Sequence, residues 1–178
     1  MPVLELVYET HSLTTDNEDG IATGWLPGRL SAAGREQAQR LGERRRDDGL
    51  AAVFASDLAR AVETAELAFD GSGIPLLLDR RLRECDYGEL NGSPVERVAA
   101  VRLQHVDSPF SGGESYRQVV ERTASFRAEL RRGWDGRRVC VIAHSANRWA
   151  LDHLVHGTPL EALVEVPFEW REGWEYRL

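Results

Sequence analysis

The chain of 178 residues contains no lysine, although it carries 22 basic residues. All of these basic residues are therefore arginines. Without lysine, the chain has neither the amine that forms Schiff bases with carbonyl substrates nor the lysine of a phosphate-binding P-loop. These two classes of enzyme are excluded.

Cysteine is scarce as well, since the chain has only Cys85 and Cys140. The two are far apart in the sequence and neither belongs to a Cys-X-X-Cys pair, so no disulfide framework is expected. Cys140 lies inside the apolar run 139–143 and is expected to be a small core residue.

Long apolar runs are also absent: no stretch approaches the roughly 18 apolar residues of a membrane span. The first residues lack the basic region that begins a signal peptide, so we expect a cytoplasmic protein. The formal net charge of −7 disfavours nucleic acids and anionic membranes as partners, because both bind basic faces. The sequence does not indicate the oligomeric state.

Short apolar runs alternate with amphipathic segments along the chain. Strands are expected at residues 3–8, 51–55, 74–78, 139–143 and 173–178. Helices are expected at residues 31–47, 56–70, 114–132 and 147–155. The pattern between residues 80 and 113 is weak, apart from a helix expected from Pro94. This alternation predicts an α/β fold, a three-layer α/β/α sandwich with a mostly parallel central sheet, formed by residues 1–178 as one domain.

Two histidines, His11 and His144, follow two of these apolar runs. Because the carboxyl ends of parallel strands meet at one edge of a sheet, the two side chains are expected to share a ligand crevice there. A histidine in such a place can act as acid, base, metal ligand or nucleophile. Neither residue has a second ligand at the spacing of a metal motif, which disfavours a metal site.

Arg60 and Glu84 are predicted to lie near the same edge. Arg60 occurs in the first turns of a helix, where the helix N-terminus favours anions and a guanidinium group can clamp a phosphate. Glu84 follows the strand at 74–78, where a carboxyl group can serve as a general acid. Taken alone, either residue is more often a solvated surface charge. Three further histidines are expected to be surface or packing residues: His105, His153 and His156.

Five segments in order are spread over nearly the whole chain: His11 to Asn17 with Thr23-Gly24-Trp25 and Arg29–Ala38, Ser56–Ala65, Leu82–Gly92, Gly112–Ser115 and Val141–Ser145. The second matches the pattern S-x-L-x-R-A-x-x-T-A. Each is a weak signal alone, but the ordered set resembles the histidine phosphatase superfamily, the phosphoglycerate mutase-like family.

The resemblance implies a phosphohistidine mechanism on a small phosphorylated substrate, with no metal or organic cofactor. His11 would attack phosphorus and become transiently phosphorylated. Glu84 would protonate the leaving oxygen and then activate water. Four further residues would contact the substrate or surround the phosphoryl oxygens: Asn17, Thr23, Arg60 and His144.

One position departs from the family's pattern. The opening motif is R-H-G, whereas this chain has Thr10 before His11 and Ser12 after it. Losing one charge-assisted pair costs about 1.5–3 kcal/mol, or roughly ten- to a hundredfold in phosphate affinity. The Thr10 hydroxyl would supply one neutral hydrogen bond, and Arg148 is the candidate to replace the missing cation.

Three functions therefore compete. The first is a phosphatase that hydrolyses a small phosphomonoester. The second is a catalytically impaired relative that binds a phosphorylated ligand or partner without turnover. The third is a phosphoglycerate mutase, which is disfavoured because the 60 positions from Glu84 to His144 are few for the extra capping segment of such mutases.

Overall fold

The computed structural model describes residues 3–178 and contains a five-stranded sheet with the order β4-β3-β6-β1-β7. Its strands are β1 (Glu5–Thr10), β3 (Ala52–Ala55), β4 (Leu76–Leu78), β6 (Arg138–Ala143) and β7 (Trp174–Arg177). Four of them run parallel, and only β7 is antiparallel to its neighbour β1. The predicted mostly parallel sheet is confirmed.

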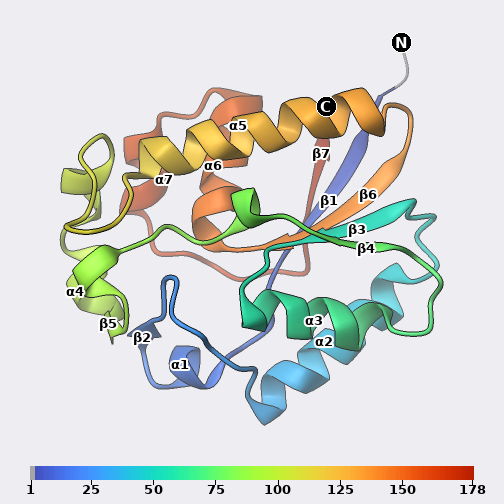
Figure 1. The fold of residues 1–178 in the computed structure, drawn as a ribbon, viewed down its shortest axis with the longest axis horizontal. Coiled ribbons are helices and arrows are strands. Elements are labelled where there is room, and N and C mark those ends of the chain that lie inside the picture. Colours follow the sequence, from blue (N-terminus) through green and yellow to red (C-terminus); the bar gives the residue numbers. More distant parts are fainter. Residues whose placement is uncertain (1–2) are drawn as a thin grey trace.

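Helices cover both faces of the sheet (Figure 1). On one face lie α2 (Ala32–Arg45) and α3 (Ala59–Phe69), which pack on each other. The other face carries α5 (Tyr116–Gly133), α6 (Ser145–His156) and α7 (Leu160–Glu165). The three-layer arrangement expected from the sequence is therefore present.

The central strand β6 shows why both faces are covered. Val139 and Val141 belong to the apolar cluster that includes residues of α5. Cys140 and Ile142 belong to the cluster on the opposite face, with residues of α2 and α3. Alternate side chains of a strand point to opposite faces, so an apolar run of this kind needs a cover on each side. Cys140 is a buried core residue, as predicted.

The start of α3 differs from the prediction. Ser56 and Asp57 were expected to open this helix, but it begins at Ala59 with Leu58 as N-cap. Instead, Ser56 Oγ accepts a hydrogen bond from the backbone N of Leu58, and the Asp57 carboxylate pairs with Arg83. Both side chains are thereby fixed at the carboxyl edge of the sheet.

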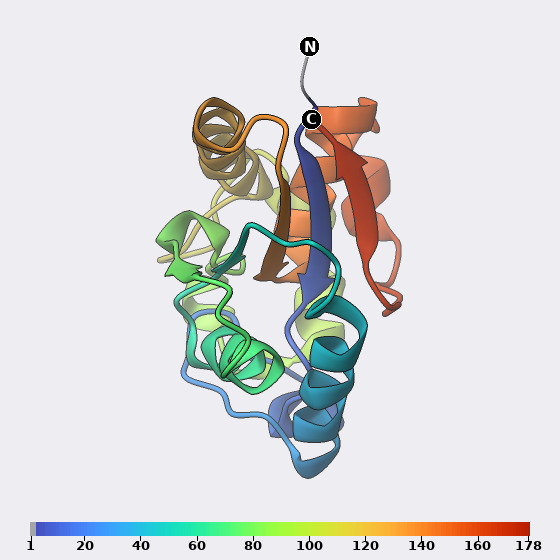
Figure 2. The ribbon, with the colours of Figure 1, turned by 90° about the vertical axis from the view of Figure 1, so that its right-hand side faces the viewer.

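Several short elements lie beyond that edge, and the sequence indicated only one of them. The helix α4 (Val95–Ala99) begins after Pro94, as predicted. The others are α1 (Thr15–Glu18), the paired strands β2 (Ile21–Ala22) and β5 (Ser93–Pro94), and the 3-10 helices η1 (Arg80–Leu82), η2 (Gly88–Leu90) and η3 (Arg102–His105). In Figure 2, β1 runs downward from the N-terminal end toward the part of the molecule that holds α1.

Within residues 3–178, no helix combines the length and apolar composition needed to cross a membrane. The same residues contain no group of three or more potential metal-ligating side chains close enough together to hold a metal ion.

Candidate active site

The adjacent strands β1 and β6 bring His11 and His144 together. Thr10 pairs with Ala143 in the parallel register, and the backbone N of His11 donates to the Ala143 carbonyl over 2.9 Å. The two imidazole ring centroids are 5.1 Å apart. The prediction that both histidines lie at one edge of the sheet is confirmed.

The hydrogen bond at Nδ1 sets the tautomer of His11. This nitrogen lies 2.8 Å from the Ser12 carbonyl oxygen, which can only accept, so Nδ1 carries the proton and Nε2 keeps a lone pair. Burial, and next the Arg60 guanidinium, lower the pKa of His11 to about 3. His11 is therefore neutral at pH 7, and its Nε2 is unprotonated, as a nucleophile requires.

Arg60 is the cation that faces this nitrogen. Its Nε donates a hydrogen bond to His11 Nε2 over 3.4 Å. Its two terminal nitrogens donate to the backbone carbonyls of Gly24, over 2.8 Å, and Leu26, over 3.4 Å. Although Arg60 is only 2% exposed, no carboxylate in the described part of the chain forms an ion pair with it. Its charge can therefore act on a bound anion.

His144 is fully buried beside His11. Its Nε2 lies 2.9 Å from Ser56 Oγ. Because the Ser56 oxygen already accepts from the Leu58 amide, its own proton can go to Nε2, which leaves Nδ1–H as a donor. That nitrogen has no hydrogen-bond partner among residues 3–178. Burial, and next Arg60, hold the pKa of His144 well below its ordinary value.

Glu84 places its carboxylate at the N-terminus of α6, where the helix dipole favours an anion. One oxygen accepts from the backbone N of Cys85, over 2.7 Å, and of Ala146, over 3.3 Å. The other accepts from Ser145 Oγ over 3.0 Å. Asp86 is the other carboxyl group of this loop, but its Oδ1 accepts from Gly88 N and from the side-chain amide of Asn91.

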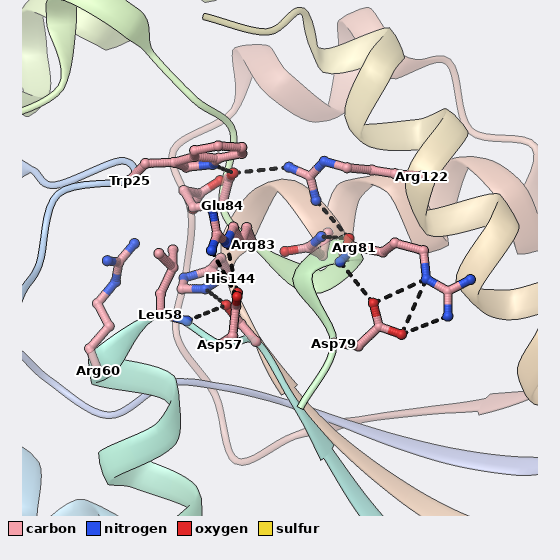
Figure 3. Close-up of polar contacts among 12 residues, drawn as sticks. Trp25, Asp57, Leu58, Arg60, Asp79, Arg81, Arg83, Glu84, Arg122 and His144 are labelled. Atoms are coloured by element: carbon pink, nitrogen blue, oxygen red, sulfur yellow. Dashed lines mark hydrogen bonds and ion pairs between the residues drawn. The ribbon is translucent and has the colours of Figure 1, made fainter. Parts of the chain in front are cut away.

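Two side chains from other elements also bind the backbone of Glu84. Its carbonyl oxygen accepts from the indole Nε1 of Trp25, over 2.6 Å, and from Arg122 Nη2, over 2.9 Å. Figure 3 shows Glu84 between these two side chains, with His144 and Arg60 on the side toward the sheet. The general acid predicted from the sequence is thus fixed by both main-chain and side-chain contacts.

A cavity of about 390 Å³ opens at this edge, and predicted site residues line it: Thr10, His11, Asn17, Thr23, Arg60 and Glu84. Asn17 Oδ1 accepts from the backbone of Thr14, so its amide nitrogen remains as a donor. Thr23 Oγ1 donates to Asp16 over 2.7 Å. Thr10 Oγ1 is buried and has no partner within the described residues. His144 touches His11 but does not line the cavity.

The structure contradicts the expectation that Arg148 replaces the missing cation. Its Nη1 lies 2.5 Å from Asp152 Oδ2, and its guanidinium group lies 5.0 Å from the centre of the Trp174 ring. Both partners, together with Arg148, line a different cavity. Arg148 lies in the first turn of α6, and its contacts with Asp152 and Trp174 hold its guanidinium group outside the cavity that His11 lines.

Other cavity residues were not predicted from the sequence. Arg102, Tyr87 and Val95 come from the segment with the weak pattern, whereas Phe168 and Trp170 come from the connection between α7 and β7. Arg102 lies over the Trp149 ring, 5.3 Å from its centre. No local motif marks these residues, because they meet the site only through the folding of distant loops.

The sequence model of the histidine phosphatase superfamily (branch 1) matches residues 10–170. The chain therefore belongs to the histidine phosphatase superfamily. It is 32% identical over 152 residues to phosphoglycerate mutase-like protein 4 of Arabidopsis thaliana, a match that covers 79% of this chain and 66% of that relative. The chain thus spans about two thirds of the length of that relative.

Solved structures show the same fold. YhfR of Bacillus stearothermophilus is 26% identical, with a TM-score of 0.85 over 97% of this chain and 90% of its own. A putative α-ribazole-5'-P phosphatase of Escherichia coli is 25% identical, with a TM-score of 0.79 over 90% of this chain and 83% of its own.

Proposed function

We propose that this protein is a phosphatase that hydrolyses a small phosphomonoester through a phosphohistidine at His11. One observation carries the proposal: the unprotonated Nε2 of a neutral His11 accepts a hydrogen bond from Arg60 in a cavity whose wall includes Glu84. A nucleophile, a cation for the developing charge and an acid for the leaving group are the parts that this reaction requires.

In the first step His11 Nε2 attacks phosphorus on the side opposite to the leaving oxygen. Phosphoryl transfer has a loose transition state, so positioning and charge stabilisation supply most of the catalysis. Arg60 stabilises the negative charge on the equatorial oxygens, while the Thr10 hydroxyl and the Asn17 amide provide neutral donors. The fixed Nδ1–H bond to Ser12 keeps the ring oriented throughout.

Glu84 then serves both half-reactions. It delivers a proton to the leaving oxygen, so that the alcohol departs neutral, and afterwards takes a proton from the water that attacks the phosphohistidine. Its contacts with Cys85 N, Ala146 N and Ser145 Oγ hold the carboxyl group in place during both steps.

Binding of a phosphorylated ligand without turnover is the second candidate, and the neutral Thr10 beside His11 is the observation that favours it. A mutase, the activity that the name of the Arabidopsis relative suggests, is the third. It differs from a phosphatase in passing the phosphoryl group to a second hydroxyl group instead of water.

The test is a panel of phosphomonoesters assayed with wild type and His11→Ala. We expect turnover in the wild type, loss of turnover in the variant, and acid-labile label on His11 after rapid quenching with a labelled ester. His156→Ala is a matched control, because His156 is exposed and stacks on Tyr176, outside the cavity. Turnover that survives His11→Ala contradicts the proposal. Ligand binding without turnover supports the second candidate, and transfer to an added alcohol in place of water supports the third.

A further inference from the structure

The charges around the cavity leave little net positive charge for a phosphoryl group. Five charged or titratable groups of the described chain line it: His11 after β1, Arg60 from α3, Glu84 and Tyr87 before η2, and Arg102 from η3. Two more contact residues of its wall: Asp16 of α1, which binds Thr23, and His144, which lies against His11. Glu9 of β1 does not contribute, because it pairs with Arg45 over 2.9 Å. Among residues 3–178, Arg60 is the one cation that contacts His11.

Two carboxylates offset that cation. Burial lowers the pKa of Arg60, whereas the charges of Glu84 and Asp16 act in the opposite direction. Asp16 accepts the Thr23 hydroxyl, which places its charge beside the cavity wall. Arg102 lies against Trp149, and no hydrogen bond within the described residues joins it to His11 or Arg60.

The remaining groups near His11 are neutral donors. Thr10 Oγ1 and His144 Nδ1 are both buried and without partners in the described part of the chain. Burial and Arg60 lower the pKa of both histidines, so neither adds a positive charge at neutral pH. Neutral donors bind oxygen atoms but compensate charge less well than charged ones.

The hydrogen bonds of Glu84 bear on the source of the proton that the leaving oxygen receives. All three are accepted from N–H or O–H donors, which is the pattern of an ionised carboxylate, an acceptor on both oxygens. A carboxylate in this form must first receive a proton before it can protonate the leaving oxygen.

A singly charged phosphoryl group needs less positive charge in the cavity than a doubly charged one. It also carries a P–OH proton that Glu84 can pass to the leaving oxygen. We propose that the site takes its phosphomonoester as the monoanion, and that the proton of the P–OH group is the one that departs with the alcohol. The inference rests on the proposed function and defines the form of substrate on which that function acts.

The step balances in atoms and charge. The His11 Nε2–P bond forms, the bond from phosphorus to the ester oxygen breaks, and the P–OH proton passes through Glu84 to that oxygen. The products are a neutral alcohol and a phosphohistidine that carries the single negative charge. Water then adds its oxygen to phosphorus, Glu84 passes the proton of that water to a phosphate oxygen, and neutral His11 and dihydrogen phosphate result.

The consequence is that kcat/KM should fall on the basic side of the pH profile, and that the second pKa of the substrate should set the pH of this basic limb. The second pKa of a phosphomonoester is about 6. Above that value the monoanion fraction falls about tenfold per pH unit, and kcat/KM should fall with it. His11 and His144 stay neutral over this range and do not produce the limb.

The experiment measures kcat/KM from pH 5 to pH 9 with two phosphomonoesters whose second pKa values differ by about one unit. The proposal expects the basic limb to move with the substrate by that unit. A limb at the same pH for both esters, which would indicate an ionising group of the protein, overturns the proposal, and so does a profile without a limb.

A variant with an added positive charge in the cavity provides a second test. Thr10→Arg adds a cation beside His11, and we expect it to flatten the basic limb and raise kcat/KM at pH 8 by about ten- to a hundredfold relative to wild type. Gln39→Arg adds the same charge on the exposed surface of α2 and is the control. An unchanged limb in Thr10→Arg, or equal effects of both changes, contradicts the proposal.

Binding of inorganic phosphate separates this inference from the proposed function. Calorimetry on the wild type should show an affinity that falls as the pH rises through the second ionisation of phosphate. Turnover with a flat pH profile keeps the proposed function and overturns the inference. Absence of turnover with strongly pH-dependent phosphate binding refutes the function but supports the charge preference of the site, and pH-independent binding overturns that preference.

Discussion

At the scale of single residues, the contacts of Glu84 give its role a clear test. Glu84→Gln keeps the size of the side chain and removes its ability to transfer a proton. We expect a loss of about 10²–10⁴ in kcat for alkyl phosphates and a much smaller loss for an activated aryl phosphate, whose leaving oxygen needs little protonation. Asp86→Asn is a useful comparison, because the Asp86 side chain bonds Gly88 and Asn91 instead of lining the cavity. Equal losses of Glu84→Gln on both substrates would assign Glu84 to positioning alone.

His11 also links the site to the pH dependence of folding. Its pKa is lowered to about 3 in the folded chain, whereas an unfolded histidine has a pKa near 6.5. A depressed folded pKa gives stability that is present above about pH 6.5 and is lost as the pH falls toward 3. Burial makes His144 act in the same direction.

A neutral replacement should reduce this dependence. We expect His11→Asn to lower the slope of the unfolding free energy against pH between about 6 and 4 by roughly one proton, or about 1.4 kcal/mol per pH unit. Urea unfolding at several pH values measures the slope. His156→Asn, on the exposed end of α6, is the matched control. An unchanged slope in His11→Asn would mean that His11 titrates alike in both states.

At the scale of elements, the loop between β2 and α2 connects the cation and the acid. The carbonyls of Gly24 and Leu26 accept from Arg60, and the indole of Trp25 donates to the Glu84 carbonyl. Three successive residues of one loop therefore bind two candidate catalytic residues, the side chain of Arg60 and the backbone of Glu84. The loop has no regular structure, so these contacts define its conformation.

Trp25→Phe tests this arrangement because it keeps a ring and removes the one indole hydrogen bond. A neutral hydrogen bond contributes about 0.5–1.5 kcal/mol, so we expect kcat to fall by up to about tenfold with little change in KM. Trp134→Phe is the control, since Trp134 packs on Phe54 in the core cluster around α5. A purely structural role of Trp25 would lower stability in both variants and leave the kcat of each folded protein unchanged.

The same scale shows where sequence analysis succeeds and fails. Strands β1 and β6 are buried on both faces, so each appears in the sequence as an apolar run, and the residue after each run was predicted to reach the crevice. The elements α1, β2 and β5 are too short to carry a periodic pattern. Tertiary contacts therefore decide their structure. Arg102 in the short η3 and Trp170 in the connection between α7 and β7 also lack a periodic pattern, so the cavity wall was predicted only in part.

Arg148 illustrates a different limit. Its closeness to His144 in sequence indicated a place in the phosphate site, but a helical residue is directed by its face of the helix. On α6 that face carries Asp152 four residues later, and the ion pair with Asp152 holds the guanidinium group against Trp174. The sequence contained both partners, but not the position of β7 that brings Trp174 to this helix.

At the scale of the whole molecule, the order β4-β3-β6-β1-β7 makes the site possible. The chain reaches β6 only after more than 120 residues from β1, yet the two strands are neighbours at the centre of the sheet. The proposed nucleophile His11, the cation Arg60 and the buried His144 come from three distant parts of the chain. Each of these three residues can be identified in the sequence, but only the folded sheet brings them together.

The contact between Trp25 and Glu84 also gives the protein an intrinsic optical reporter. The indole donates a hydrogen bond to the backbone of Glu84, the proposed general acid, and the Arg83 guanidinium lies 4.7 Å from the centre of the indole ring. Indole emission shifts with nearby charge and hydrogen bonding, so the arrival of an anion beside Glu84 should alter the fluorescence of this ring without any added dye. The fluorescence of Trp25 should then report the binding and release of a ligand in the cavity in real time.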